Sequence, residues 1–188
     1  PRGFTCNLMR TLSKAANTHT NNFFFFSHSY MYSHPKPEKR LLIFNKKHLD
    51  LLKTTYECLQ IGIKEAQPGK TFGDIGYKIQ EYAENKNYSV VRDFCGHGIG
   101  QQFHTPPSVL HYGNLGEGPK LKPGMFFTIE PMINLGDWKV KILNDGWTAV
   151  TKDKSYSAQF EHTIGITEEG NEIFTLSENN TDFPINDL

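Results

Sequence analysis

The chain has 188 residues, of which 37% are hydrophobic and 21% charged, and this gives room for one domain with a buried core. Its formal net charge of zero is unevenly distributed: residues 1–48 hold eight Lys and Arg against one acid, whereas residues 49–188 hold twelve against nineteen, and this acidic balance argues against nucleic acid as a partner. Three cysteines at no metal-ligand spacing support neither a disulfide framework nor a zinc knuckle, so a reducing compartment, the cytoplasm, is expected.

The first 44 residues differ from the rest of the chain. They lack helical or strand periodicity, and their apolar block, Phe23–Phe26, is too short to span a membrane or to form the core of a signal peptide, so we expect no membrane partner. The absence of acids before Glu38 permits an organellar transit peptide. We favour a disordered leader, unrelated to the domain that follows and punctuated at its end by Pro35 and Pro37.

Two helices joined by a tight turn are predicted next. From Asn45 to Gln67, apolar residues recur at three- and four-residue intervals, which places them on one stripe of an amphipathic helix: Leu49, Leu52, Tyr56, Leu59 and Ile63. Pro68-Gly69 ends this helix. Thr71 followed by Asp74 resembles a capping box with aspartate in place of the usual Glu or Gln, and it opens a second helix that runs to about Asn87.

The stretch from Cys95 to His104 combines three glycines within five positions with two histidines, His97 and His104, seven residues apart. Glycine lets the backbone adopt positive φ and approach a ligand closely, and imidazole serves as a metal ligand and as an acid–base group. We predict a loop that directs His97 into a site. A glycine-rich loop with incidental histidines is the alternative at this point.

After Tyr88 the apolar pattern changes to a period of two or to short apolar runs. Segments of strand length, separated by turn residues, are 89–92, 125–133, 147–151, 160–167 and 172–176. Helices first and mainly antiparallel strands afterwards are typical of the α+β class. We therefore expect two helices packed on a mainly antiparallel sheet.

Glu130 and Glu161 lie inside predicted strands that otherwise belong in a core. A buried ionised carboxylate is costly unless it is paired with a cation or bound to a metal. A salt bridge is one explanation, but Arg92 is the only arginine beyond residue 40. A metal site is the other, because the imidazole of His97 together with two carboxylates suits a divalent transition metal.

These residues belong to a series of motifs that resembles a known family. The motifs are Gly96-His97-Gly98-Ile99-Gly100 with His104, Thr128-Ile129-Glu130-Pro131-Met132, Asp145-Gly146-Trp147-Thr148 and Gln159-Phe160-Glu161-His162-Thr163. In this order, from about Leu49 to Leu176, they resemble the C-terminal half of a type I methionine aminopeptidase of the bacterial kind. The resemblance implies the pita-bread fold, two pseudo-symmetric halves with the active site between them. This chain would hold one half, with its curved sheet, at 45–177, followed by a tail at 178–188.

By this resemblance, His97, Glu130 and Glu161 match three of the family's five metal ligands, which hold two divalent ions such as Co, Mn, Fe or Zn. The other two ligands are aspartates of the N-terminal half, and no aspartate precedes Asp50 here. We therefore expect an incomplete metal site that binds a single metal weakly at most, loss of hydrolysis by the chain alone, and the N-terminal half as a candidate partner. A fragment, a frameshifted gene or an aberrant splice product would each give such a chain.

The resemblance also implies an activity, the removal of the initiator methionine from the N-terminus of nascent proteins by metal-assisted hydrolysis. Glu130 and His104 match the catalytic positions: Glu130 moves the proton of the attacking water, and His104 contacts the substrate and donates toward the reacting amide. The positions that match the lining of the methionine pocket are Cys95, Phe103 and Trp147.

Two other classes of function stay open. A pita-bread protein that binds without catalysis would keep the fold and lose the metals, but the retained His97, Glu130 and Glu161 argue against it. A proline-directed aminopeptidase or prolidase would share these ligands, whereas Trp147 in Asp-Gly-Trp-Thr and the Glu130-Pro131-Met132 sequence favour methionine.

Overall fold

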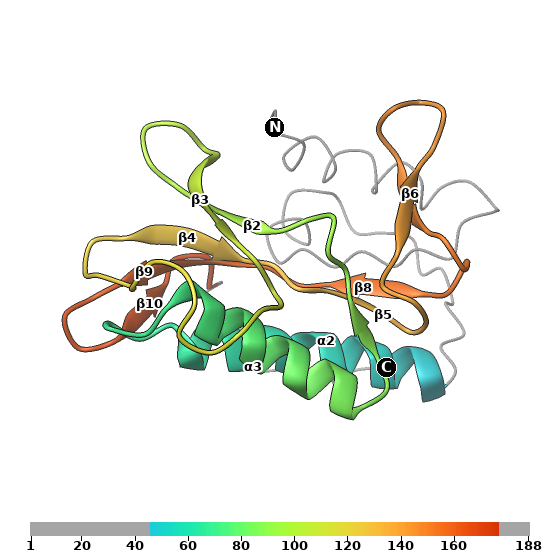
Figure 1. Ribbon diagram of the computed structural model, residues 1–188, viewed down its shortest axis with the longest axis horizontal. Helices are drawn as coiled ribbons and strands as arrows, with labels where there is room; N and C mark the ends of the chain where they lie inside the picture. Colours follow the sequence, from blue (N-terminus) through green and yellow to red (C-terminus); the bar gives the residue numbers. More distant parts are fainter. Residues whose placement is uncertain (1–45, 177–188) are drawn as a thin grey trace.

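The computed structural model describes residues 46–176. The predicted leader, 1–44, and the predicted tail, 178–188, lie outside these residues, so the boundaries of the domain stay predictions. Two helices open the described part, α2 (Lys46–Glu65) and α3 (Phe72–Asn85), and they lie side by side against one face of the strands (Figure 1). No helix within residues 46–176 is both long enough and apolar enough to cross a membrane.

Helix α2 follows the predicted apolar stripe. Leu52, Leu59 and Ile63 are buried, whereas the other two residues of the stripe are partly exposed at its margin. The helix stops three residues before Pro68, as proline requires. Gly69 then takes a φ of 86°, a value that glycine adopts without strain, and the chain turns toward α3.

Helix α3 begins with the capping box predicted from the sequence. The Asp74 N–H donates to Thr71 Oγ1 at 3.2 Å, and the Thr71 N–H donates to Asp74 Oδ2 at 2.7 Å. The other carboxylate oxygen of Asp74 accepts from the Gly116 N–H at 2.8 Å, which ties the helix to the loop before β4. Ile75 and Ile79 are fully buried on the face toward α2.

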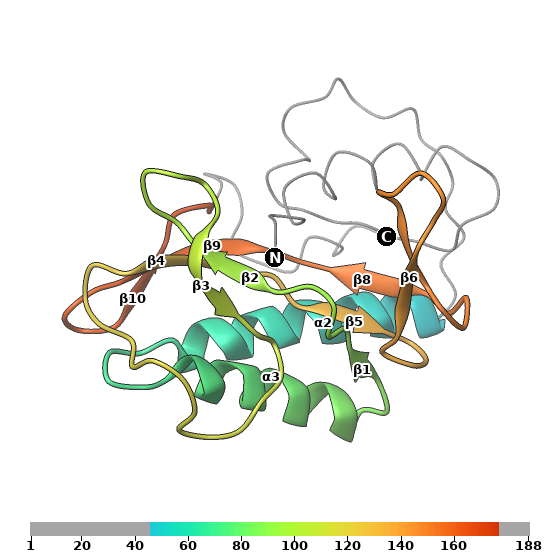
Figure 2. The same ribbon diagram turned by 45° about the horizontal axis from the view of Figure 1, so that its top comes forward.

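Ten strands follow the helices in the described residues and form three antiparallel sheets. They are β1 (Ser89–Val90), β2 (Gly96–Gly98), β3 (Thr105–Val109), β4 (Phe126–Ile129), β5 (Met132–Asn134), β6 (Val140–Ile142), β7 (Ala149–Thr151), β8 (Ser157–Gln159), β9 (His162–Ile166) and β10 (Asn171–Ile173). The largest sheet has the order β10-β9-β4-β2-β3, and the second has the order β1-β5-β8. Strands β6 and β7 form a hairpin that projects away from the helices (Figure 1, Figure 2). The α+β class is confirmed.

The predicted strand 125–133 is two strands rather than one. Strand β4 pairs with β9 in the larger sheet, whereas β5 pairs with β8 in the smaller sheet, so the chain changes sheets at Glu130-Pro131. Proline has no N–H for a sheet ladder, which favours the break at this point. The predicted strand 160–167 is also shortened by a change of sheet. Strand β8 ends at Gln159 in the smaller sheet, and β9 begins only at His162 in the larger sheet.

The sequence pattern does not predict four strands of the described chain, namely β2, β3, β6 and β8. Strand β2 corrects the predicted loop around His97, since this segment pairs with β3 on one side and β4 on the other. Each of the four has three to five residues, and glycines, prolines, a lysine or small polar residues make the local pattern weak. Pairing with distant segments defines these strands.

The core lies between the two helices and the two larger sheets. Phe72 of α3 meets Phe127 of β4 edge to face, with ring centroids 5.0 Å apart. Gly62 lets α2 approach closely, because a Cβ at this position would lie 2.7 Å from Ile79 Cδ1 and 3.0 Å from Ile129 Cγ2. The helices thus fix β4, and Glu130 follows directly at its end.

Candidate metal centre

His97 lies in the middle of strand β2, between two glycines. Gly96 and Gly98 do not use the freedom of glycine to adopt positive φ. They are needed for packing: a Cβ on Gly96 would collide with the Thr128 carbonyl oxygen, and a Cβ on Gly98 with the Pro106 carbonyl oxygen. The two glycines let β3 and β4 lie close to β2, which fixes the position of His97 in the sheet.

The imidazole of His97 is oriented by its own strand. Its Nδ1 lies 3.0 Å from the Gly98 carbonyl oxygen, an acceptor, so the proton is assigned to Nδ1. The lone pair is then on Nε2, which lies 3.9 Å from Glu130 Oε1. A neutral imidazole with one nitrogen bonded to a carbonyl and the other open is the form that binds a metal ion.

Glu130 and Glu161 come together where the chain changes from one sheet to the other. The last pair of β4 and β9 is Ile129 with His162, and the next pair, in β5 and β8, lies three residues further along both segments. The same antiparallel register sets Glu130 opposite Glu161 in the gap, and directly opposed residues approach to roughly 5 Å between Cβ atoms. The prediction that both glutamates lie inside strands is therefore corrected: each lies beside a strand end, where the ladder is interrupted.

The two carboxyl groups are buried, and in the described residues no Lys or Arg pairs with them. Burial raises the pKa of Glu130 well above its usual value, and the Glu161 carboxylate raises it further, although hydrogen bonds from Thr128 and Gln159 lower it. Burial also raises the pKa of Glu161 to about 7. Within residues 46–176, neither carboxylate forms an ion pair with Lys or Arg, so the salt-bridge explanation finds no support there. Facing carboxyl groups of this kind suit a bound cation.

Three residues that the sequence analysis left without a role hold Glu130 in place. Thr128 Oγ1 donates to Glu130 Oε1 at 2.8 Å, and Gln159 Nε2 donates to Glu130 Oε2 at 3.1 Å. The Glu130 N–H donates to His111 Nε2 at 3.0 Å, and burial lowers the pKa of His111 to about 3, so this imidazole is uncharged. Strand alternation could have indicated Thr128, two residues before Glu130. No local pattern indicates His111.

His104 and Phe103 lie beside His97. The ring centroids of His97 and His104 are 4.1 Å apart, and those of His97 and Phe103 are 5.2 Å apart. Burial lowers the pKa of His104, and the neighbouring His97 lowers it further, so His104 is mainly neutral at pH 7. Phe103 is 57% exposed and lies at the solvent-facing edge of this group of three rings.

The two remaining candidates differ in their placement. Cys95 is partly buried, and this burial raises the pKa of its thiol. The Glu130 carboxylate also raises the thiol pKa, so Cys95 lies close enough to Glu130 for an electrostatic interaction. Trp147 lies in the β6–β7 hairpin, where its backbone N–H donates to Asp145 Oδ1 at 3.0 Å. Figure 2 shows this hairpin apart from β2 and β3. The role of Trp147 stays a prediction.

The donor set suits a divalent transition ion, but it is assembled only in part. An imidazole nitrogen and carboxylate oxygens are ligands that such ions take in proteins. In the described part of the chain, no three His, Cys, Asp or Glu side chains are grouped closely enough to hold a metal ion. The structure brings His97 Nε2 to 3.9 Å from Glu130 Oε1, and Glu161 lies opposite Glu130 in the strand register. That all three residues are ligands of one metal centre stays a prediction.

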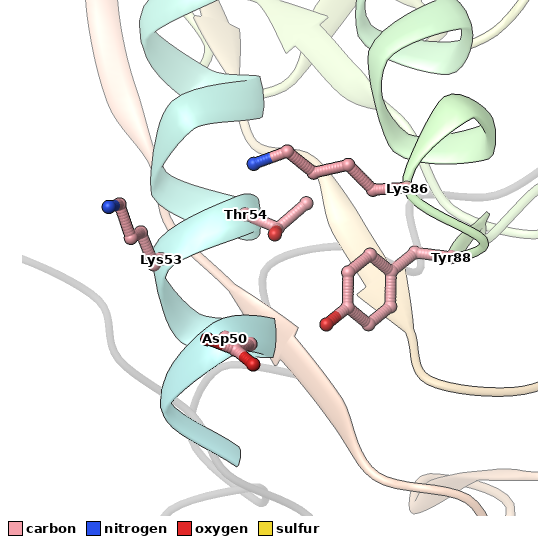
Figure 3. A pocket seen from close by; sticks show the side chains of 5 residues that line it. All are labelled: Asp50, Lys53, Thr54, Lys86 and Tyr88. Atoms are coloured by element: carbon pink, nitrogen blue, oxygen red, sulfur yellow. The ribbon is translucent and has the colours of Figure 1, made fainter. Parts of the chain in front are cut away.

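A separate polar pocket of about 320 Å³ lies between α2 and the end of α3 and holds none of the predicted site residues (Figure 3). Its lining residues are Asp50, Lys53, Thr54, Lys86 and Tyr88. Lys86 Nζ is 2.7 Å from Glu57 Oε2, so its charge is already compensated. The pocket therefore adds nothing to the metal centre.

The chain matches metallopeptidase family M24 over residues 31–168, and it belongs to this family. It is 59% identical over 128 residues to methionine aminopeptidase A of Synechocystis and 58% identical over 135 residues to a methionine aminopeptidase of Rickettsia prowazekii. These alignments cover 68% and 71% of this chain but 51% and 52% of the relatives. The chain thus spans about half the length of the curated relatives that it matches, and it corresponds to their C-terminal half.

Solved structures agree with this assignment. The crystal structure of methionine aminopeptidase from Rickettsia prowazekii superimposes with a TM-score of 0.68 at 58% identity, covering 69% of this chain and 53% of that one. The enzyme from Thermotoga maritima gives 0.69 at 45% identity, with coverage of 71% and 53%. A prolidase from Pyrococcus horikoshii, at 24% identity and a TM-score of 0.53, shares the fold alone. The pita-bread fold is confirmed for this half.

Proposed function

We propose that the chain is the C-terminal half of a metal-dependent aminopeptidase that removes the initiator methionine from nascent proteins in the cytoplasm. The observation that carries the proposal is the pair of His97 Nε2 and Glu130 Oε1, 3.9 Å apart, with Glu161 opposite Glu130 in the strand register. Relatives at 46–59% identity named methionine aminopeptidase support methionine as the residue removed.

Two divalent ions, with Co, Mn, Fe or Zn as candidates, would supply the Lewis acidity that makes water a nucleophile near neutral pH. His97 would hold an ion through Nε2, and Glu130 and Glu161 would contribute oxygens. Glu130 would also accept the proton of the attacking water and pass it to the leaving amine. His104 would donate a hydrogen bond to the reacting carbonyl as negative charge develops on its oxygen.

The side chain of the substrate methionine would lie against Cys95 and Phe103, with Trp147 as the third wall. Burial keeps the Cys95 thiol protonated, because the thiolate would lose its hydration, and an uncharged thiol suits an apolar thioether. Phe103 is exposed beside His97 and His104, where it is free to cover a bound side chain.

The proposal includes a second half of comparable length, because the matched region is about half of each relative. By resemblance this half brings two aspartates that complete the ligand set. The three donors of this chain alone leave both ions short of anionic ligands, so an attacking water is less acidified. Peptide hydrolysis therefore requires both halves.

The test is a complementation assay. The purified chain, given Co²⁺ or Mn²⁺, is expected to release little methionine from a Met-Gly-Ser peptide. Addition of the N-terminal half of the Rickettsia prowazekii relative, expressed as a separate polypeptide, is expected to restore release. The control is Glu130→Gln, which keeps the shape and removes the charge, and it should abolish the restored activity.

Two results would contradict the proposal. One is brisk turnover by the chain alone that Glu130→Gln abolishes, because another group would then complete the metal site. The other is a complex of the two halves, demonstrated by co-elution, that binds metal and still leaves the peptide intact.

A further inference from the structure

Thr128 occupies a central position between the two best-defined site residues. Its hydroxyl oxygen accepts a hydrogen bond from the His97 N–H at 3.0 Å, and the same hydroxyl donates to Glu130 Oε1 at 2.8 Å. The side chain is fully buried, so no water competes for either bond. One hydroxyl therefore connects the backbone of β2 with the carboxylate that follows β4.

The geometry of the hydroxyl sets the direction of both bonds. A hydroxyl has one proton, and the His97 N–H can only donate, so the Thr128 proton is directed to Glu130. The Glu130 oxygen that receives it is the same Oε1 that lies 3.9 Å from His97 Nε2. Thr128 thus acts on the oxygen that faces the imidazole.

Gln159 completes the support on the other side of the carboxylate. Its Nε2 donates to Glu130 Oε2 at 3.1 Å and lies 3.3 Å from the Glu130 carbonyl oxygen. With one donor on each oxygen, the carboxylate plane of Glu130 is fixed, and the His97 backbone is joined to the same network. A side chain held in this way loses little rotamer freedom when it takes up a metal ion.

We propose that Thr128 is a positioning residue of the metal centre: it sets the spacing between His97 and Glu130 so that both can bind one divalent ion. This inference rests on the proposed function and extends it to a residue that touches neither metal nor substrate. Removal of the hydroxyl leaves a buried N–H without an acceptor and frees the Glu130 side chain. Removal of a residue that hydrogen-bonds to a metal ligand typically lowers metal affinity about 10- to 100-fold.

The first test compares Co²⁺ affinity in four full-length chains. Thr128→Val keeps the shape and removes the hydroxyl, and it should weaken Co²⁺ binding at least about tenfold. Thr128→Ser keeps the hydroxyl and should bind within about threefold of the wild type. Thr151→Val is the matched control, because Thr151 is also a buried strand threonine, and its hydroxyl donates to the Ser155 carbonyl at 2.6 Å, outside this site. It should bind as the wild type does.

Equal Co²⁺ affinity for Thr128→Val and the wild type would overturn the inference, and so would equal losses in Thr128→Val and Thr151→Val. A wild-type chain that takes up no Co²⁺ would count against the proposed function. The role of Thr128 is then tested by urea unfolding of the metal-free chain. In EDTA, the shift of the urea midpoint caused by Thr128→Val should be at least halved in the Glu130→Met background, because methionine has no carboxylate to accept the Thr128 hydrogen bond. The same shift in both backgrounds would overturn the inference.

Discussion

Gly96 lies where β4 comes closest to β2. A Cβ at this position would collide with the Thr128 carbonyl oxygen, which belongs to the backbone and cannot rotate away. We predict that Gly96→Ala lowers the free energy of unfolding by at least about 2 kcal/mol, because only separation of the two strands relieves the overlap. Urea unfolding followed by circular dichroism measures the loss.

Gly100→Ala is the matched control for this substitution. The nearest atom to a Cβ on Gly100 is Thr105 Cγ2 at 3.8 Å, an ordinary van der Waals contact. We expect its effect on the free energy of unfolding to stay within about 0.5 kcal/mol. If both variants lose the same amount, close packing is not the reason for glycine at position 96.

Single residues of the site could be recognised from the sequence where their chemistry conflicts with their surroundings. Glu130 and Glu161 are charged residues in apolar segments, and this contrast is local. The contribution of His111 to the site is not local, because it accepts from the Glu130 backbone 19 residues away. The role of Gly96 depends likewise on which strand becomes its neighbour.

At the scale of elements, the capping box gives α3 a pH-dependent contribution to stability. Burial alone would raise the pKa of Asp74, but hydrogen bonds from the N–H groups of Thr71 and Gly116 and from the Thr71 hydroxyl outweigh it and lower the pKa below the usual 3.8. A carboxyl whose pKa is lower in the folded chain adds stability above its unfolded pKa and loses it as the pH falls through the folded pKa.

We therefore predict that Asp74→Asn lowers the free energy of unfolding by about 1–2 kcal/mol at pH 7, and by less below a pH of about 3.8. Urea unfolding at pH 7 and pH 3 measures the two differences. Asp93→Asn, at an exposed position, is the control and should change little at either pH. A deficit of Asp74→Asn that is as large at pH 3 as at pH 7 would show that charge is not involved.

The helices could be predicted more fully than the strands. The periodicity of α2 and the capping residues of α3 are local, and both helices begin and end near the predicted positions. Strands β2 and β8 have three residues each, and only their partners in the two sheets make them strands. The break of the predicted strand at Glu130-Pro131 follows from a change of sheet, which no short segment reveals.

At the scale of the whole molecule, the site lies at the junction of two sheets. The pairing of β4 with β9 stops there, the pairing of β5 with β8 lies on the other side, and the gap between the two ladders holds Glu130 and Glu161. The shared register of the two ladders sets the two glutamates opposite each other. The register of both sheets, rather than any single segment, therefore positions the residues of the candidate metal centre.

The central claim is that His97 and Glu130 bind one metal ion in this chain. Crystals grown with Zn²⁺ test it through the anomalous scattering of zinc. We predict a peak about 2.0–2.2 Å from His97 Nε2 and from an oxygen of Glu130, with Glu161 as the next carboxylate, and the loss of this peak in Glu130→Gln. A fully occupied peak elsewhere with none at His97, or the same peak in Glu130→Gln, would contradict the account.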